Sequence, residues 1–200
     1  LYLQVALDEL RMFGEYERVG KLIESLPGTV TGIYEFVLDH LEREHGEGFV
    51  RRVMSYLACG RYGMTEAELL ALTETEGGGV TPLKWARLYR ILASHLIQRG
   101  DTLDFYHRQL REAVRWQYLS DGEAVKATHA LMADYFEEQP LTDRRKLEEQ
   151  PRHQKLAGRW DELGSLLTDS HFLEAKNEAG MTYDLSADLQ AALDALPVHH

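Results

Sequence analysis

The stretch LDFYHRQLREAV, residues 103–114, places an ionisable ring between two different local patterns. Apolar side chains precede His107 as in a short strand, and a basic segment with helical spacing follows it. An imidazole at the start of a helix can donate a hydrogen bond to an anion, and the first backbone N–H groups of the helix are donors for the same anion. The alternative is a histidine that only caps the helix or packs at the junction.

Basic side chains gather in the same part of the sequence. Residues 81–119 contain seven Lys or Arg and three Asp or Glu, whereas the whole chain has a net charge of −11. The residues of a possible nucleic-acid or docking face are Lys84, Arg87, Arg90 and Arg99. The acidic total charge and the inward position expected for Trp85 favour docking on another domain, or simple solvation, over contacts with DNA phosphates.

Other residues of catalytic or metal-binding type do not form a recognisable site. Cys59 is the only cysteine and lies in an apolar helical run, which predicts a buried thiol and no disulfide. His40 and Glu44 could form half of a metal site, but no second pair accompanies them, so we expect a polar surface pair. No Ser-His-Asp or paired-carboxylate arrangement follows from the spacing, and we predict neither a catalytic residue nor a metal ligand.

Helical periodicity dominates the elements that must position these residues. Helices are predicted over residues 1–13, 16–26, 31–44 and 49–58, after a capping box of Thr65 and Glu68, and from Thr81-Pro82 onward. Residues 95–106 predict a hairpin that turns at Arg99-Gly100-Asp101, and helical spacing returns in residues 108–119. The remaining predicted helices are 123–138, a charged helix over 142–149 between Pro140 and Pro151, and short helices from residue 153.

These elements predict a mainly α fold: a helical bundle plus a winged-helix domain with one small β-hairpin, followed by helical hairpins. The expected division is a helical domain at residues 1–46, a winged-helix domain at 47–119 and a helical-repeat-like region at 120–200. We expect Trp160 to be a core residue.

Composition limits the class of protein. Apolar residues make up 44% of the chain, and no apolar run reaches the roughly 18 residues of a membrane span. A single cysteine fits a reducing, cytoplasmic setting. The chain begins with Leu1 in a helical pattern rather than with Met, so we expect a fragment of a longer protein.

Three stretches together resemble NACHT-type STAND nucleotide-binding proteins: LYLQVALDELRMFG, the block that ends in FYHRQLREAV, and LAGRWDELGSLL with the helices after it. In that family a P-loop ATPase core is followed by a helical domain, a winged-helix domain and sensor repeats, often WD or tetratricopeptide repeats. Residues 1–46 would then be the C-terminal part of the nucleotide-binding module. The glycines at 77–79 lack the Lys and Ser/Thr of a P-loop. The chain would therefore be no enzyme by itself, while its parent protein would be an ATPase.

The resemblance also implies roles. His107 would reach the β-phosphate of ADP and hold the resting state. ADP or ATP with Mg²⁺ would be cofactors of the parent protein and not of this fragment. The partners would be the missing ATPase core, the sensor repeats and further copies on activation, with nucleic acid unexpected and no membrane. The expected function is the regulatory, nucleotide-sensing arm of a STAND signalling ATPase.

Two functions of other classes remain open. One is a winged-helix DNA-binding transcriptional regulator, for which the basic side chains after Thr81 would contact phosphates. The other is a helical protein-interaction scaffold without a nucleotide role.

Overall fold

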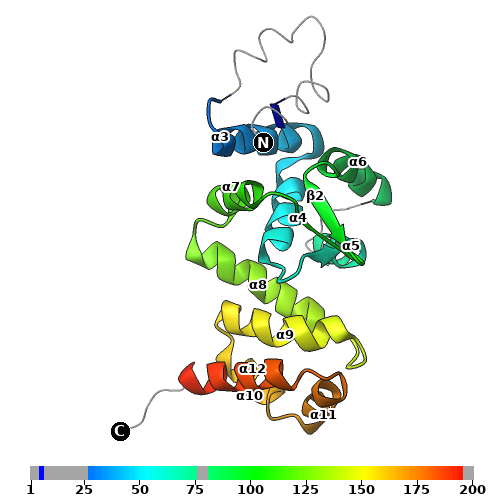
Figure 1. Ribbon diagram of the computed structural model, residues 1–200, viewed down its shortest axis with the longest axis vertical. Coiled ribbons are helices and arrows are strands. Elements are labelled where there is room, and N and C mark those ends of the chain that lie inside the picture. The colour runs from blue at the N-terminus through cyan, green and yellow to red at the C-terminus, as the bar shows by residue number, and fades with distance from the viewer. Residues whose placement is uncertain (1–4, 7–26, 76–80, 196–200) are drawn as a thin grey trace, which may run out of the picture. The chain divides into compact units, whose positions relative to one another are not determined.

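The computed structural model describes residues 5–6, 27–75 and 81–195 of the chain (Figure 1). The chain forms two compact units, Leu1–Ser120 and Asp121–His200. The described part is mainly α with one small antiparallel sheet, which confirms the predicted fold class. The predicted helices over 1–13 and 16–26 lie outside the described residues, except for residues 5 and 6. The division into domains 1–46, 47–119 and 120–200 stays a prediction.

The first unit alternates helices with three short strands. Its elements are α3 (Val30–His45), α4 (Glu47–Cys59), β1 (Met64–Thr65), α5 (Glu66–Thr75), α6 (Pro82–Leu92), β2 (Leu96–Arg99), β3 (Thr102–Phe105) and α7 (Arg108–Tyr118). The strand order is β1-β3-β2, and both pairings are antiparallel. The central strand β3 therefore joins the predicted hairpin to a third strand that the sequence analysis did not include.

Local capping signals set the starts of three helices. The Thr29 hydroxyl accepts from Gly32 N at the start of α3. The predicted capping box forms before α5, where Thr65 N donates to Glu68 Oε2 (2.8 Å) and Glu68 N donates to Thr65 Oγ1 (3.1 Å). Thr81 caps α6 ahead of Pro82, as predicted, and accepts from Lys84 N at 3.2 Å.

The strand β1 depends on one glycine. Gly63 has φ +85°, and a Cβ added there would lie 2.2 Å from the Leu103 carbonyl oxygen of β3. Only glycine combines this left-handed conformation with so close a backbone approach. The next residue, Met64, pairs with Leu103. Gly63 thus lets the chain after α4 reach the middle strand.

The core of the first unit lies around α4. Its side chains at Val50, Val53, Met54 and Leu57 are fully buried. Helix α6 buries the predicted stripe of Trp85, Leu88, Ile91 and Leu92, while Arg87 and Arg90 are exposed and Lys84 is half-buried. Burial of this stripe fixes the orientation of Arg87 and Arg90.

The second unit is entirely helical over its described residues. It contains α8 (Gly122–Glu137), α9 (Arg144–Ala157), α10 (Trp160–Leu166), α11 (Ser170–Glu178) and α12 (Thr182–Ala195). The expected end of the charged helix before Pro151 is wrong, because α9 continues through Pro151 to Ala157. Burial on both sides of the proline, at Leu147 and His153, outweighs its lost backbone hydrogen bond.

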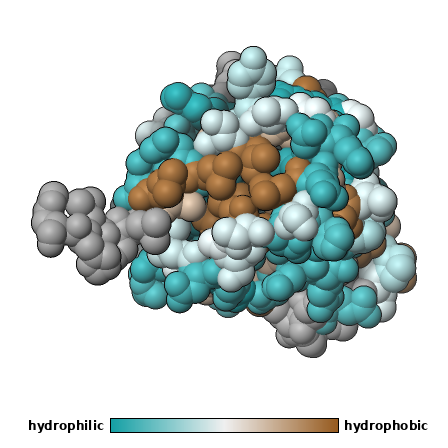
Figure 2. All heavy atoms as spheres, turned by 90° about the horizontal axis from the view of Figure 1, so that it is seen from below, coloured by the Kyte–Doolittle hydropathy of each residue, from teal (hydrophilic) through white to brown (hydrophobic). Residues whose placement is uncertain are grey.

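The core of this unit consists of Leu147, Leu163, Leu167, Phe172 and Met181. Trp160 is 41% exposed, so the expectation that it is a core residue is wrong; the first turn of α10 leaves its indole at the surface. Helix α12 has no fully buried residue, and Leu189 and Leu193 are exposed on it. Figure 2 shows the apolar band on the face that carries this helix.

Candidate functional site

His107 lies between β3 and α7. It is the N-cap residue of α7 with an extended backbone, φ −114° and ψ 131°, and its side chain makes no capping hydrogen bond. The imidazole is half-buried and meets the Tyr106 ring edge-on, with the ring centroids 4.5 Å apart. Tyr106 N donates to His95 O at 2.9 Å, which continues the hairpin up to this position. The ring is thus fixed at a strand end but remains accessible.

A partly buried ion pair holds α7 against β3. The Asp104 carboxylate accepts a hydrogen bond from the Arg111 guanidinium and another from Phe105 N (2.7 Å). Arg111 also lies over the Phe105 ring, 5.3 Å from its centroid. Because Asp104 belongs to β3 and Arg111 to the second turn of α7, this pair positions the junction that carries His107. This pair was not predicted from the sequence, although a charged residue in the alternating pattern of a strand is a signal.

The start of α7 offers donors to an anion. No acidic residue lies in its first turn, and Arg108 is its first residue, with an exposed side chain. Of the first backbone N–H groups, that of Leu110 points back to His107 O at 3.2 Å. A helix of 11 residues carries a partial positive charge at this end. The imidazole, the helix end and Arg108 together suit a phosphate group rather than a cation.

The structure places three of the four predicted basic residues on α6 and exposes two of them. Arg87 and Arg90 are exposed on α6, and the Lys84 ammonium lies 4.8 Å from the centroid of the Phe49 ring. The end of α3 faces them at His45. Burial is the main reason that the pKa of His45 is below its ordinary value, although Glu44 opposes it. The three cations of α6 lower that pKa further, which shows that their field reaches His45.

Arg99 lies apart from His107 along the hairpin. It pairs with Thr102 next to the turn at Gly100, whereas His107 follows the opposite end of β3. His107 is five positions after Thr102, a distance of about 16 Å along an extended strand. Arg90 lies in the last turn of α6, shortly before His95. Because His95 O accepts from Tyr106 N, this end of α6 connects to the hairpin at the end that carries His107.

The remaining residues of chemical interest have structural surroundings. Cys59 is buried. His40 Nε2 and Glu44 Oε1 lie 3.5 Å apart as a polar pair on α3. Over the residues that the structure describes, no group of three or more His, Cys, Asp or Glu could hold a metal ion. Within the same residues, no helix is long and apolar enough to cross a membrane.

The second unit contains a buried polar cluster that the sequence analysis also missed. His129 on α8 and His153 on α9 approach through their Nδ1 atoms at 2.7 Å. His153 Nε2 lies 3.2 Å from Glu149 Oε2, and both residues are fully buried. Arg145 binds the other carboxylate oxygen at 3.1 Å. The four-residue spacing of Glu149 and His153 was a signal in the sequence. The third member, His129, lies 24 residues before His153, and nothing in the sequence connects the two.

The chain is similar to segments of several known proteins. No protein-family model and no solved structure matches it. A TPR repeat-containing protein of Dictyostelium discoideum is 25% identical over 178 residues, 86% of this chain and 11% of that protein. The NACHT domain- and WD repeat-containing protein 1 of Homo sapiens is 38% identical over 117 residues, 48% of this chain and 7% of that protein. Telomerase protein component 1 of Rattus norvegicus is 27% identical over 218 aligned residues, 92% of this chain and 8% of that protein.

These relatives are long proteins. The chain spans between 7% and 11% of the length of the three that are described above. Proteins with NACHT domains and WD repeats from Mus musculus and a second one from Homo sapiens also match, at 33% and 24% identity. The chain is therefore similar to short segments of long proteins, among them proteins that contain NACHT domains and WD repeats.

Proposed function

We propose that this chain is the regulatory, nucleotide-sensing arm of a NACHT-like STAND signalling ATPase, in which His107 holds the ADP-bound resting state. The similarity to NACHT and WD-repeat proteins supports the class of the parent protein. In this proposal the ATPase core, with ADP or ATP and Mg²⁺, is another part of that protein. This chain binds and orients, and it catalyses no step by itself.

The order of elements in the first unit supports a winged-helix assignment for residues 47–119. A helix, a strand, two helices and a two-stranded hairpin follow one another from α4 to β3. The strand order β1-β3-β2 places the first strand beside the last, as a helix-turn-helix with a wing requires. The arm would thus consist of helix α3 and the preceding residues, this winged helix, and the helices of the second unit.

The single observation that carries the proposal is the position of the His107 ring. It is accessible, it stands at the start of α7, and the Asp104–Arg111 pair fixes the backbone on either side of it. A protonated imidazole together with the N-terminal N–H groups of α7 can bind the terminal phosphate of a diphosphate. A bound anion would in turn favour the protonated ring, so binding would strengthen the contact.

The basic face of α6 supports docking on another domain. Arg87 and Arg90 are exposed, and their charges together with that of Lys84 lower the pKa of His45. We assign this face to the ATPase core of the same protein, to which it would dock while ADP is bound. Loss of the diphosphate contact would then shift the population toward an open arrangement that is free to assemble further copies.

The experiment uses the full-length parent protein and a fluorescent ADP. We expect His107→Ala to accelerate ADP dissociation about tenfold or more, because a hydrogen bond to a charged group contributes about 1.5–3 kcal/mol. His107→Gln, which keeps a donor without a charge, should give an intermediate rate. The matched control is His171→Ala, which removes an exposed histidine of α11 in the second unit.

Three results would decide against the proposal. Unchanged ADP dissociation in His107→Ala would favour the interaction scaffold. An equal acceleration in His171→Ala would indicate general destabilisation rather than a lost contact. Nanomolar binding of duplex DNA by the chain, with a steep dependence on salt, would favour the transcriptional regulator.

A further inference from the structure

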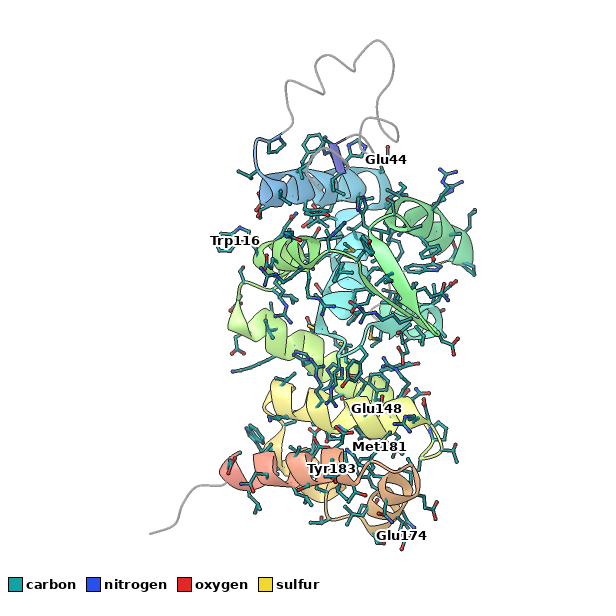
Figure 3. The ribbon with its side chains drawn as sticks, viewed as in Figure 1. Glu44, Trp116, Glu148, Glu174, Met181 and Tyr183 are labelled. Atoms are coloured by element: carbon teal, nitrogen blue, oxygen red, sulfur yellow. The ribbon has the colours of Figure 1, made fainter. Side chains whose placement is uncertain are left out.

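Trp116 is the most exposed tryptophan in the described part of the chain. It lies on α7 with 72% of its surface accessible, and Figure 3 shows the indole pointing away from the helix into solvent. Trp85 is buried and Trp160 is 41% exposed. A large aromatic side chain that the fold leaves outside is the residue type that most often dominates binding at protein interfaces.

The indole borders a groove between α3 and α7. The groove has a volume of about 530 Å³ and is lined by Glu35, Asp39, Trp116, Gln117 and Ser120. All five residues belong to the first unit. Two carboxylates from α3 thus lie across from one exposed aromatic ring of α7.

Among the residues that the structure describes, no cation forms an ion pair with the two carboxylates of the groove. Glu35 makes no hydrogen bond or ion pair with any residue that the structure describes. The Asp39 carboxylate accepts a hydrogen bond from the neutral amide of Gln117 at 3.1 Å, whereas the Arg43 guanidinium donates to the backbone carbonyl of Asp39, also at 3.1 Å. The two residues are four apart on one helix, where like charges repel and destabilise the helix. A cation placed between them would remove this repulsion.

The neighbouring tyrosine provides a second measure of the negative field. Tyr118 donates to Glu42 Oε1 at 2.6 Å, one helical turn beyond Asp39. Burial raises the pKa of Tyr118 most, and the hydrogen bond to Glu42 and the charges of Glu42, Asp39 and Glu47 raise it further. The acidic field therefore extends along this whole side of α3.

We propose that the groove between α3 and α7 binds an arginine-bearing segment of a partner protein, with Trp116 as the stacking platform and Glu35 and Asp39 as the ion-pairing groups. A guanidinium is planar, stacks on an indole face and pairs with carboxylates through parallel donors, whereas an ammonium offers only a point charge. The net charge of −11 favours approach of a basic partner. The groove is negatively charged, whereas the α6 face is positively charged. Binding in the groove does not depend on the nucleotide role of His107.

The test titrates the whole chain, labelled with ¹⁵N, with the peptide Gly-Arg-Gly-Arg-Gly-Arg-Gly in about 0.15 M salt, near physiological ionic strength. The three indole N–H signals act as internal probes. We expect the Trp116 signal to move with saturation while the Trp85 and Trp160 signals stay in place. The same peptide with lysine should bind more weakly, and the same peptide with glutamate should not bind.

Variants separate the groove from general charge attraction. Trp116→Ala should weaken arginine-peptide binding about threefold to fivefold, the range for a cation on an exposed aromatic ring. Glu35→Gln with Asp39→Asn should weaken it by a similar factor. The matched controls are Trp160→Ala, and Asp101→Asn with Glu174→Gln, which remove an exposed indole and the same two charges elsewhere. Backbone spectra identify any variant that fails to fold, and Trp116→Gln then replaces Trp116→Ala.

Several outcomes would overturn the proposal. Equal weakening by the control pair would show attraction to the total charge of the chain. Peptide binding that is unchanged in Trp116→Ala would show that Trp116 is not the stacking platform. The absence of any peptide binding would contradict the proposal as a whole. Self-association of the chain that the groove variants abolish, without peptide binding, would assign the groove to a second copy.

Discussion

His129 and His153 face each other through their Nδ1 atoms, 2.7 Å apart, and join α8 to α9 inside the second unit. Only one of the two nitrogens can carry the proton between them. The Glu149 carboxylate, 3.2 Å from His153 Nε2, favours a proton on that nitrogen. A neutral His153 then accepts at Nδ1, and His129 donates. The Phe136 ring is stacked on His153 with an interplanar angle of 4°.

The first prediction follows from this pair and concerns pH. Burial lowers the pKa of His153 below its ordinary 6.5, although Glu149 opposes the shift. As the pH falls, His153 therefore binds a proton in the unfolded chain before it does so in the folded chain. The contribution of the neutral ring to the free energy of unfolding is complete above pH 6.5 and is lost below it, by up to about 1.4 kcal/mol per pH unit for one proton. Urea unfolding between pH 7.5 and 5, followed by hydrogen exchange in α9, measures the loss.

The other charges around the pair add to this dependence. Burial would raise the pKa of Glu149, but His153, Arg145 and Arg152 outweigh it and hold the pKa below 4.5. A further loss is therefore expected as the pH falls below 4.5. His153→Gln, or His129→Gln if the first variant does not fold, should flatten the dependence near pH 6. The exposed His171→Gln should leave it intact, and an unchanged profile in the buried variants would contradict the assignment.

The second prediction concerns the pair that positions His107. Asp104→Ala leaves the Arg111 guanidinium without its carboxylate and Phe105 N without its acceptor. We expect the free energy of unfolding to fall by about 2–3 kcal/mol. Glu112→Ala, which breaks the exposed pair with Arg108, should change it by about 0.5 kcal/mol or less. Chemical unfolding of the chain measures both, and similar effects of the two variants would argue against a positioning role.

The third prediction concerns the third strand. Gly63→Ala should destabilise the chain by about 2 kcal/mol or more, because the added Cβ meets the Leu103 carbonyl oxygen and the backbone is left-handed. Gly122→Ala is the control, since its Cβ would have nothing within 4 Å. Thermal unfolding compares the two. Equal stability would mean that β1 does not depend on this close approach.

The fourth prediction tests whether the positive charges of α6 act on the imidazole of His45 at the end of α3. Arg87→Gln with Arg90→Gln removes two charges that lower the pKa of His45, so this pKa should rise. An NMR titration of the His45 ring follows it directly. Arg99→Gln, at the hairpin turn, should leave the His45 titration unchanged. A rise of the same size in that control would indicate a long-range effect of net charge.

Local chemistry made much of the fold predictable. The capping box of Thr65 and Glu68 and the Thr81-Pro82 start involve residues at most three apart, so the sequence displays them directly. The hairpin follows from the turn at Gly100 and the alternation around it. The strand β1 was not predicted because two residues have no period, and its pairing partner Leu103 lies 39 positions away. Pro151 gave a misleading stop signal because long-range packing decides that helix.

The candidate sites divide in the same way. His107 could be singled out because it stands at a change of period, and the structure places it at the N-cap of α7. The ion pair of Arg111 with Asp104 depends on how α7 packs on β3. The groove between Glu35 and Trp116 depends on which faces of α3 and α7 meet. A single sequence without contacts carries no such information. The role of His107 toward a diphosphate stays a prediction that the parent protein must test.

The middle strand has a mechanical consequence. β3 is paired on one edge with β1 and on the other with β2, and its carboxylate is fastened to α7. A strand restrained on both edges cannot slide by one residue without breaking two ladders at once. We therefore expect a push on the tip at Gly100 to displace His107 as well, so that the hairpin acts as a stiff lever between a remote contact and the imidazole.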